Sequence, residues 1–284
     1  MLFQDARDYQ ILFLTSFLTL GIATRDWTLN PELIVIVIAT CLLTQWISDD
    51  IKSFRISQQN NFKLSNPLKL PSLRSALITG LGLSLLLRAD SFPTMIIAGF
   101  LAILSKHIFK FNNKHFFNPA NFGIISVLTL TSDAWVSPGQ WGDEWWYALL
   151  FFGTGGLILK QVGRWDTTAI FLGSYALLEA NQNMWLGWTW DVFLHRLMSG
   201  SLLLFALFML TDPRSIPNAK VSRWIWAICI AGLTFILRNQ YYVPTAIFWA
   251  LFALAPLTAI LDIIWAAPRF NWFNSSNELM TTKS

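Results

Sequence analysis

Charged residues are scarce in this chain, and their scarcity excludes most soluble folds. Asp, Glu, Lys and Arg make up 13% of the 284 residues, whereas hydrophobic residues make up 54%. Ordinary soluble domains carry about a quarter charged residues, so a globule of this size would leave large apolar areas in water. Tryptophan occurs 15 times, mostly at the edges of apolar runs, where its amphipathic ring suits lipid headgroups. The composition therefore predicts an integral membrane protein.

Motifs for metal, nucleotide or nucleophile chemistry are also missing. The two cysteines, Cys41 and Cys229, lie inside apolar runs without a CxxC partner and indicate neither a disulfide framework nor a zinc site. No GxGxxG, P-loop or HExxH pattern occurs. The net charge of +4 is scattered between apolar runs and forms no basic surface of the kind that binds nucleic acid. We expect no nucleic-acid partner, no metal site and no catalytic residue, and any nicotinamide chemistry would belong to a partner.

Ten apolar segments follow one another along the chain. Several are only about a dozen residues long, and such a helix covers about 20 Å of a hydrocarbon core roughly 30 Å thick. Short segments are typical of half-helices and broken helices that neighbouring helices bury. The expected segments are Tyr9–Thr24, Glu32–Ile47, Ser75–Leu87, Phe92–Ile108, Pro119–Thr131, Trp145–Leu159, Thr167–Leu178, Leu197–Leu210, Val221–Leu237 and Tyr242–Trp265.

Basic residues favour one side of this arrangement. If the loop 49–74 is cytoplasmic, ten crossings place all but four of the 20 Lys and Arg residues on the cytoplasmic side. The positive-inside rule therefore favours ten spans with both termini in the cytoplasm. The expected location is the plasma membrane or another energy-transducing membrane, although the charge bias does not identify which. Residues 1–10 include acids, and no cleavage site follows the first apolar run, so we expect no signal peptide.

An ordered internal similarity runs along the chain. LITGLGLSLLLRADSFP and LMSGSLLLFALFMLTDPRSIP share a hydroxyl residue with Gly, an apolar stretch, an Asp and a Pro. AGFLAILSK then matches AGLTFILRN, and FFNPANF matches YYVPTAIF. Since each copy has five segments, the second copy must cross the membrane upside down, and inverted repeats place their site at the interface. We expect an all-α membrane fold with a first repeat over 1–131, an extracytoplasmic link over 132–144 and a second repeat over 145–284 that ends in a short cytoplasmic tail.

Two proline-containing stretches carry helix-terminus chemistry that suits a binding site. Asn118 can cap a helix that begins at Pro119, whose positive end would face the interface between the repeats. Asp212 lies at an apolar boundary, where a charge is costly unless it is paired or functional. Helix capping alone would explain Asn118 and Asn121 as well as a binding role does. A cap or turn at the membrane surface would likewise explain Asp212. The candidate cofactor-binding residues are Thr79, Gly80, Lys106, Asn118, Pro119, Asn121, Ser199, Gly200, Thr211 and Asp212.

These motifs resemble those of the RnfD/NqrB family, the membrane subunits of Rnf and sodium-pumping NADH:quinone oxidoreductase complexes. Asn118 to Ile124 is similar to the family's IFNPA stretch, and Ser199 to Pro217 resembles its SGxxxxxxFFxxTDPxTxP signature. The similarity runs from about Arg74 to Arg238. The opening DARDYQILFL, the NPANFGI form and WVSPGQWG at 135–142 look closer still to a short branch, the UnbU-type membrane proteins of enediyne gene clusters.

The resemblance implies a urea-transporter-like fold of two inverted repeats that binds flavin and couples electron transfer to ion translocation beside other membrane redox subunits. Family members with covalent FMN carry an SGAT-type threonine in a long extension between segments five and six. Here that link is only 132–144, and the chain contains no SGAT. The expectation is therefore a flavin, FMN or riboflavin, held without a covalent bond. The aromatic residues and donors around it would be Lys106, His107, Phe116, Phe117, Asn118 and Asn121.

Other functions stay open at this point. The same fold suits a small-solute channel or transporter, and the chain would also serve as a non-redox membrane partner of an assembled complex. Ordinary helix packing explains the aromatic residues near Asn118 as well as a flavin slot does. His107 and His115 alternate with lysines and are expected in a solvated cytoplasmic loop.

Overall fold

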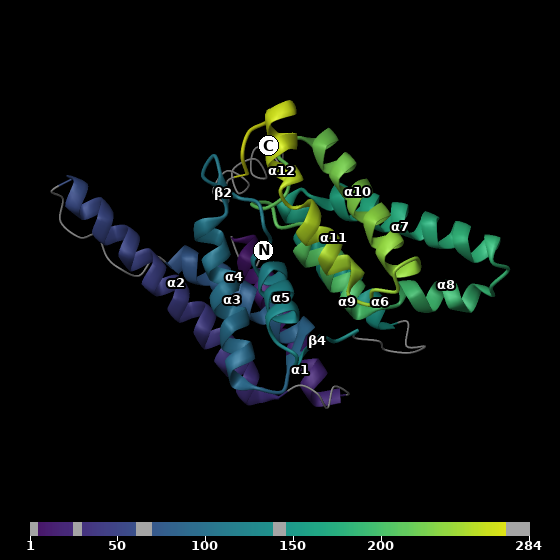
Figure 1. Cartoon of the computed structure of the whole chain (residues 1–284), viewed down its shortest axis with the longest axis horizontal. Coiled ribbons are helices and arrows are strands. Elements are labelled where there is room, and N and C mark those ends of the chain that lie inside the picture. The colour runs from purple at the N-terminus through teal and green to yellow at the C-terminus, as the bar shows by residue number, and fades with distance from the viewer. Residues whose placement is uncertain (1–4, 25–29, 61–69, 139–145, 271–284) are drawn as a thin grey trace, which may run out of the picture.

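The computed structural model describes residues 5–24, 30–60, 70–138 and 146–270. Two groups of helices lie side by side, an N-terminal group and a C-terminal group (Figure 1). The helices are α1 (Ala6–Thr24), α2 (Pro31–Asn60), α3 (Leu70–Leu86), α4 (Phe92–Ile108), α5 (Pro119–Leu130), α6 (Trp146–Val162), α7 (Trp165–Trp185), α8 (Trp190–Leu197), α9 (Gly200–Leu204), the π-helix η1 (Phe205–Met209), α10 (Lys220–Asn239), α11 (Ala246–Leu254) and α12 (Leu257–Ile264).

The predicted all-α class is confirmed over the described residues. Each of the ten apolar segments coincides with one helix or with two consecutive ones: η1 continues α9, and α12 follows α11 after a bend of 47°. Two described helices, α2 over Pro31–Phe54 and α10, are long and apolar enough to cross a membrane, and the bent pair α11–α12 makes a third candidate. The other apolar helices are shorter, as the sequence predicts. The number of crossings stays a prediction.

Two short ribbons were not predicted. Strands β1 (Leu87–Ala89) and β4 (Ala134–Val136) pair antiparallel, and so do β2 (Lys110–Phe111) and β3 (Lys114–His115). Asn112 and Asn113 connect β2 to β3 with positive φ angles of 47° and 63°, a conformation that Asn tolerates better than most residues. The link predicted at 132–144 is described only as far as residue 138, and the predicted tail beyond residue 270 lies outside the described residues.

Close helix packing defines the N-terminal group. Helix α2 packs against α3 and α4, α1 against α3, and α5 against α4. Gly123 makes the last contact possible, because a Cβ there would lie 2.6 Å from the carbonyl oxygen of Ala98 and 2.9 Å from the Cβ of Ala102. Two hydroxyl residues at the start of α4, Ser91 at its N-cap position and Thr94 in its first turn, donate to Asp133. These hydrogen bonds lower the pKa of Asp133 to about 2 and fix the start of α4 to the segment before β4.

The C-terminal group repeats part of this arrangement. Helix α10 packs against α7 and α11, as α4 does against α2 and α5. Helix α6 packs against η1, where a Cβ on Gly155 would lie 2.8 Å from Leu207. The two groups meet through α1 against α6 and α5 against α11. Helix α8 has no counterpart among the predicted segments, and together with the end of α7 it projects from the body (Figure 1).

Candidate functional site

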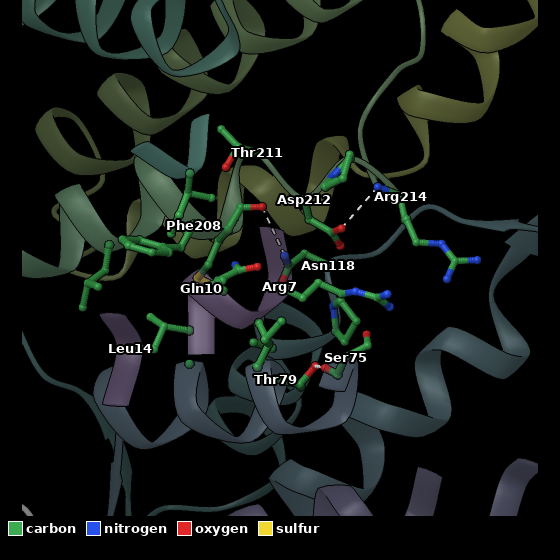
Figure 2. Close-up of a pocket in the computed structure, with 18 of the residues that line it drawn as sticks. Arg7, Gln10, Leu14, Ser75, Thr79, Asn118, Phe208, Thr211, Asp212 and Arg214 are labelled. Carbon is green, nitrogen blue, oxygen red and sulfur yellow. Dashed lines mark hydrogen bonds between the residues drawn. The ribbon is translucent and has the colours of Figure 1, made fainter. Parts of the chain in front are cut away.

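A cavity of about 90 Å³ lies between the two helix groups. Figure 2 shows side chains from both groups turned toward it. Since one water needs roughly 10–15 Å³ of such volume, the cavity has room for several waters. One end is apolar and the other is polar. The residues that line it include Arg7, Gln10 and Leu14 from α1, Ser75, Thr79, Gly82 and Leu86 from α3, His115, Asn118, Pro119 and Ala120 at the start of α5, Ile158 and Val162 from α6, and Leu204, Phe208, Met209, Thr211, Asp212, Pro213 and Arg214 from η1 and its flanks.

Asn118 caps α5 as predicted. Its side-chain oxygen accepts a hydrogen bond from the Asn121 amide at 3.1 Å, and Pro119 occupies the first turn. The Asn118 side-chain amide also crosses to the other group and donates to the Met209 carbonyl at 3.1 Å. Asn118 therefore joins the start of α5 to the end of η1 at the cavity wall.

Asn121 makes a second connection between the groups. Its side chain is buried and donates to the Phe248 carbonyl of α11 at 3.1 Å. The side-chain oxygen and amide of Asn118 and the side-chain amide of Asn121 are thus already hydrogen-bonded within the protein. Their contribution to a ligand site is to hold its walls in place.

The π-helix η1 gives the cavity its second wall. In η1 the Leu210 amide bonds to the Phe205 carbonyl, one residue further back than in an α-helix, and such single π turns are frequent at functional sites. Side chains from neighbouring helices use the carbonyls of this segment: Thr168 donates to Ala206 at 2.7 Å, and Asn118 donates to Met209. The apolar run that reads as a plain helix in sequence is therefore an irregular segment whose carbonyls are paired.

Asp212 lies at the polar end of the cavity. One carboxylate oxygen accepts from the Arg214 amide at 3.2 Å, and the other lies 3.7 Å from Nε2 of His115. Burial raises the pKa of Asp212, but the nearby imidazole of His115 and the amide and charge of Arg214 outweigh burial, so the pKa lies below its ordinary value. Asp212 therefore takes part in a turn, as the structural interpretation predicted. It also faces the cavity, as the binding-site interpretation predicted.

Lys106 reaches the cavity indirectly. It is buried in α4, and its Nζ lies 3.2 Å from Oγ and 3.4 Å from the carbonyl of Ser75, which lines the cavity. Thr79 also lines the cavity and donates to the same carbonyl at 2.9 Å. The carbonyl of Ser75 is therefore the point where these two predicted residues meet.

Three predicted residues lie elsewhere. Gly80 faces α2, where a Cβ would lie 3.1 Å from the Cα of Ile38. Ser199 and Gly200 stand at the other end of the α9–η1 run from Thr211, about 18 Å away at 1.5 Å per residue. Ser199 donates to the Pro138 carbonyl at 2.9 Å. None of the three is among the lining residues, so their similarity between the repeats reflects helix starts and packing.

A lysine of the β2–β3 hairpin holds the loop that carries Asp212. Lys114 Nζ donates to the Ile216 carbonyl at 2.5 Å, to Asn218 Oδ1 at 3.2 Å and to Asp262 at 2.7 Å. The other carboxylate oxygen of Asp262 accepts from the Asn218 amide at 2.8 Å. The same hairpin presents His115 to Asp212, so it both fixes the loop and contacts its acid.

The histidine prediction was wrong. His107 belongs to α4 and is half-buried, and the side chain of His115 is only 12% exposed beside Asp212. The solvated loop expected there is replaced by a helix end and a hairpin.

The expected aromatic slot is filled by packing. Phe116 and Phe117 contact each other, and Phe117 stacks on Phe252 with ring centres 5.0 Å apart. The aromatic ring that lines the cavity is Phe208. Sequence reasoning missed Phe208 together with Arg7, Gln10 and Ser75, because nothing in the sequence separates them from other residues of apolar helices.

The fold and the cavity define a class: an all-α membrane protein with a pocket between two helix groups that is apolar at one end and polar at the other. Residues 130–270 match the NQR2, RnfD, RnfE family. The resemblance to the RnfD/NqrB family is thereby confirmed, and the chain is a relative of that family. The closer resemblance to UnbU-type proteins stays a prediction.

Curated relatives agree with this assignment. The D subunit of the ion-translocating oxidoreductase complex of Vibrio atlanticus is 31% identical over 124 residues, which cover 43% of this chain and 35% of that protein. The D subunit of the proton-translocating ferredoxin:NAD(+) oxidoreductase complex of Clostridium ljungdahlii is 25% identical over 238 residues, covering 66% of this chain and 72% of that protein. The ion-translocating D subunit of Actinobacillus pleuropneumoniae is 29% identical, with 38% and 32% covered. The chain thus spans about a third of the length of the first relatives that it matches.

Proposed function

We propose that the chain is a membrane subunit of an RnfD/NqrB-like electron-transport system and holds flavin, FMN or riboflavin, without a covalent bond in the pocket between the helix groups. The convergence of the two signature stretches carries the proposal. Asn118 and Asp212 are 94 positions apart in sequence, yet both line one cavity, and Asn118 donates to the residue three positions before Asp212.

The lining suits one edge of an isoalloxazine ring better than a whole flavin. Leu86, Ile158 and Phe208 would contact its apolar face, and Gln10 and Asp212 would hydrogen-bond its polar edge. Because the cavity has room for only several waters, binding requires the two helix groups to separate slightly. A bound flavin supplies one- and two-electron transfer, while the protein orients it and sets its electrostatics.

The proposal includes ten spans in two inverted repeats, 1–131 and 145–284, with both termini in the cytoplasm. The matching neighbours of α4 and α10 support it, as do the contacts of α1 with α6 and of α5 with α11. Contacts between equivalent helices are expected where a two-fold axis relates two halves.

Partners are inferred from the relatives' names. Those relatives are subunits of ion-translocating or proton-translocating oxidoreductase complexes. We propose that this chain likewise assembles with other membrane redox subunits in a lipid bilayer and that electron transfer through it is coupled to ion movement. The electron donor and acceptor would bind to those subunits.

Spectroscopy of the purified chain tests the proposal. We expect absorbance bands near those of free flavin and a yellow supernatant with flavin fluorescence after acid denaturation, because no covalent bond retains the group. Colourless protein that also fails to take up added FMN and riboflavin would contradict the proposal. Flavin that stays with the precipitated chain would show a covalent bond and contradict the non-covalent part.

The size of the cavity favours a second candidate, a channel or transporter for a small polar solute. A space for several waters between two related halves suits such a solute without any widening. Solute flux into proteoliposomes that contain the colourless protein would support this candidate, and flavin-bearing protein without flux would support the first.

A further inference from the structure

Exposed aromatic side chains gather at the end of the molecule where α8 lies. They come from three separate parts of the chain: strand β4, the α7–α8 hairpin and the turn between α10 and α11. Trp185 is the most exposed of them, at 89%. We call these six residues the aromatic collar: Trp135, Trp185, Trp188, Trp190, Tyr241 and Tyr242.

Hydrogen bonds bring the three parts together around α8. Ser199, just after α8, donates to the carbonyl of Pro138, just after β4. Arg196 of α8 donates to Asn239, the last residue of α10, at 2.5 Å. The tyrosines follow Asn239 by two and three positions. The collar is therefore one layer of the structure, and Figure 1 shows α8 at the right-hand side and β4 below the middle, both in the lower half of the view.

The layer coincides with the end of an apolar span. Helix α10 is long and apolar enough to cross a membrane from Lys220 to Asn239, and Ile225, Ile228 and Ile236 are exposed along it. Exposed side chains thus change from aliphatic along the helix to Trp and Tyr at its end. That order is typical of the passage from hydrocarbon to lipid headgroups.

Helix α8 is held firmly, and its outer side is unpartnered within the described residues. Arg196 pairs with the buried carboxylate of Glu179 at 2.5 Å, and its guanidinium lies 5.0 Å from the centre of the Trp188 ring. No residue of α8 is buried, and Trp190 and Leu194, one turn apart, are 55% and 52% exposed. Short amphipathic helices with this composition lie in the plane of a membrane interface.

We propose that the aromatic collar lies in the lipid headgroup layer on the side of the membrane away from the pocket, with α8 flat in that layer. A lipid surface fits better than a protein partner, because the exposed rings form a band across three segments at the end of an apolar span. The inference rests on the proposed membrane insertion and is independent of flavin binding.

Spin labels in the full-length protein, reconstituted into phosphatidylcholine–phosphatidylglycerol nanodiscs, test the inference. Cys229→Ser removes the exposed thiol and leaves only buried Cys41. Single labels are then placed through Trp185→Cys in the collar, Ile228→Cys in mid-α10 and Lys110→Cys on the exposed hairpin. We expect the ratio of oxygen to nickel-chelate accessibility to be highest at 228 and lowest at 110. The ratio at 185 should lie between them and differ from each by several-fold.

The reference positions separate the possible failures. A label at 185 as accessible to the nickel chelate as the label at 110 would overturn the inference and leave the α7–α8 hairpin free for a partner protein. A label at 185 as deep as the label at 228 would also overturn it, because the collar would then lie in hydrocarbon. Water accessibility at 228 itself would contradict the membrane insertion on which the inference rests.

Discussion

Two clusters of polar groups, one beside α8 and one at the cavity, are built differently. Near α8, Glu179 has both carboxylate oxygens paired, one with Arg196 at 2.5 Å and the other with the side-chain amide of Asn239 at 2.9 Å. At the cavity, Asp212 has one oxygen bound to a backbone amide, while the other has a looser contact of 3.7 Å with His115. Full pairing is typical of a cluster that stabilises the fold, whereas an acid with spare capacity beside a cavity is typical of a site.

The largest expected effect on stability belongs to Glu179. The substitution Glu179→Ala removes the carboxylate that pairs with Arg196. Breaking a buried ion pair of this kind costs about 3 kcal/mol. We expect a lower thermal unfolding midpoint in detergent. The double variant Glu179→Ala, Arg196→Ala should lose less than the sum of the single variants. Wild-type stability in Glu179→Ala would contradict the structural role.

The largest expected effect on function belongs to Asp212. Asp212→Ala should impair electron transfer and flavin retention more than Arg214→Ala, because an acid at an apolar boundary is hard to keep without purpose. Both variants should reach normal membrane levels, since Arg214 is exposed and Asp212 has no full ion pair. Equal activity of the two variants would remove Asp212 from the site.

A smaller effect is expected at the hairpin lysine. Lys114→Met removes two hydrogen bonds to the loop after Asp212, at Ile216 and Asn218, and one to Asp262 in α12. We expect a loss of about 1–3 kcal/mol with faster hydrogen exchange over residues 211–220. Lys110→Met, on the exposed strand of the same hairpin, is the matched control. Unchanged exchange over 211–220 would show that the loop holds its place without Lys114.

The smallest effect is a dependence on pH. Since the pKa of Asp212 is lowered in the folded protein, its ionised form stabilises the fold above the unfolded pKa of about 3.9. This contribution is lost as the pH falls through the lower folded pKa. We expect Asp212→Asn to flatten the acid limb of a plot of unfolding midpoint against pH below about 4. An identical acid limb in both proteins would mean that the carboxylate is not selectively stabilised.

Much of the fold could be predicted from the sequence, because apolar runs predict helices and prolines mark where helices begin or end. Pro119 after Asn118 predicted a capped helix start, and the structure has that cap. The ten apolar runs likewise predicted the positions of the helices along the chain. Helix α8 was missed because Trp190–Leu197 combines charged and aromatic residues and is too short to read as a separate apolar segment.

The candidate site was only partly accessible. Similar motifs in the two halves pointed to Asn118, Thr211 and Asp212, which do line one cavity. Repetition also pointed to Ser199 and Gly200, which lie far from it, because a repeated motif marks equivalent positions and not proximity. Which residues of α1 face the cavity depends on how the two groups pack, and periodicity within one uniformly apolar helix does not reveal that.

The central claim is that the cavity between the helix groups is where flavin binds. Gly82 lines it and an added Cβ there would meet only the Cβ of Ala120, at 3.7 Å, so Gly82→Phe fills the space without a backbone clash. Gly156, exposed on α6 with nothing near its missing Cβ, gives the control Gly156→Phe. The direct measurement is the amount of flavin per purified chain in the three proteins. We predict wild-type occupancy for Gly156→Phe and little or none for Gly82→Phe, whereas full occupancy in Gly82→Phe would place the flavin elsewhere.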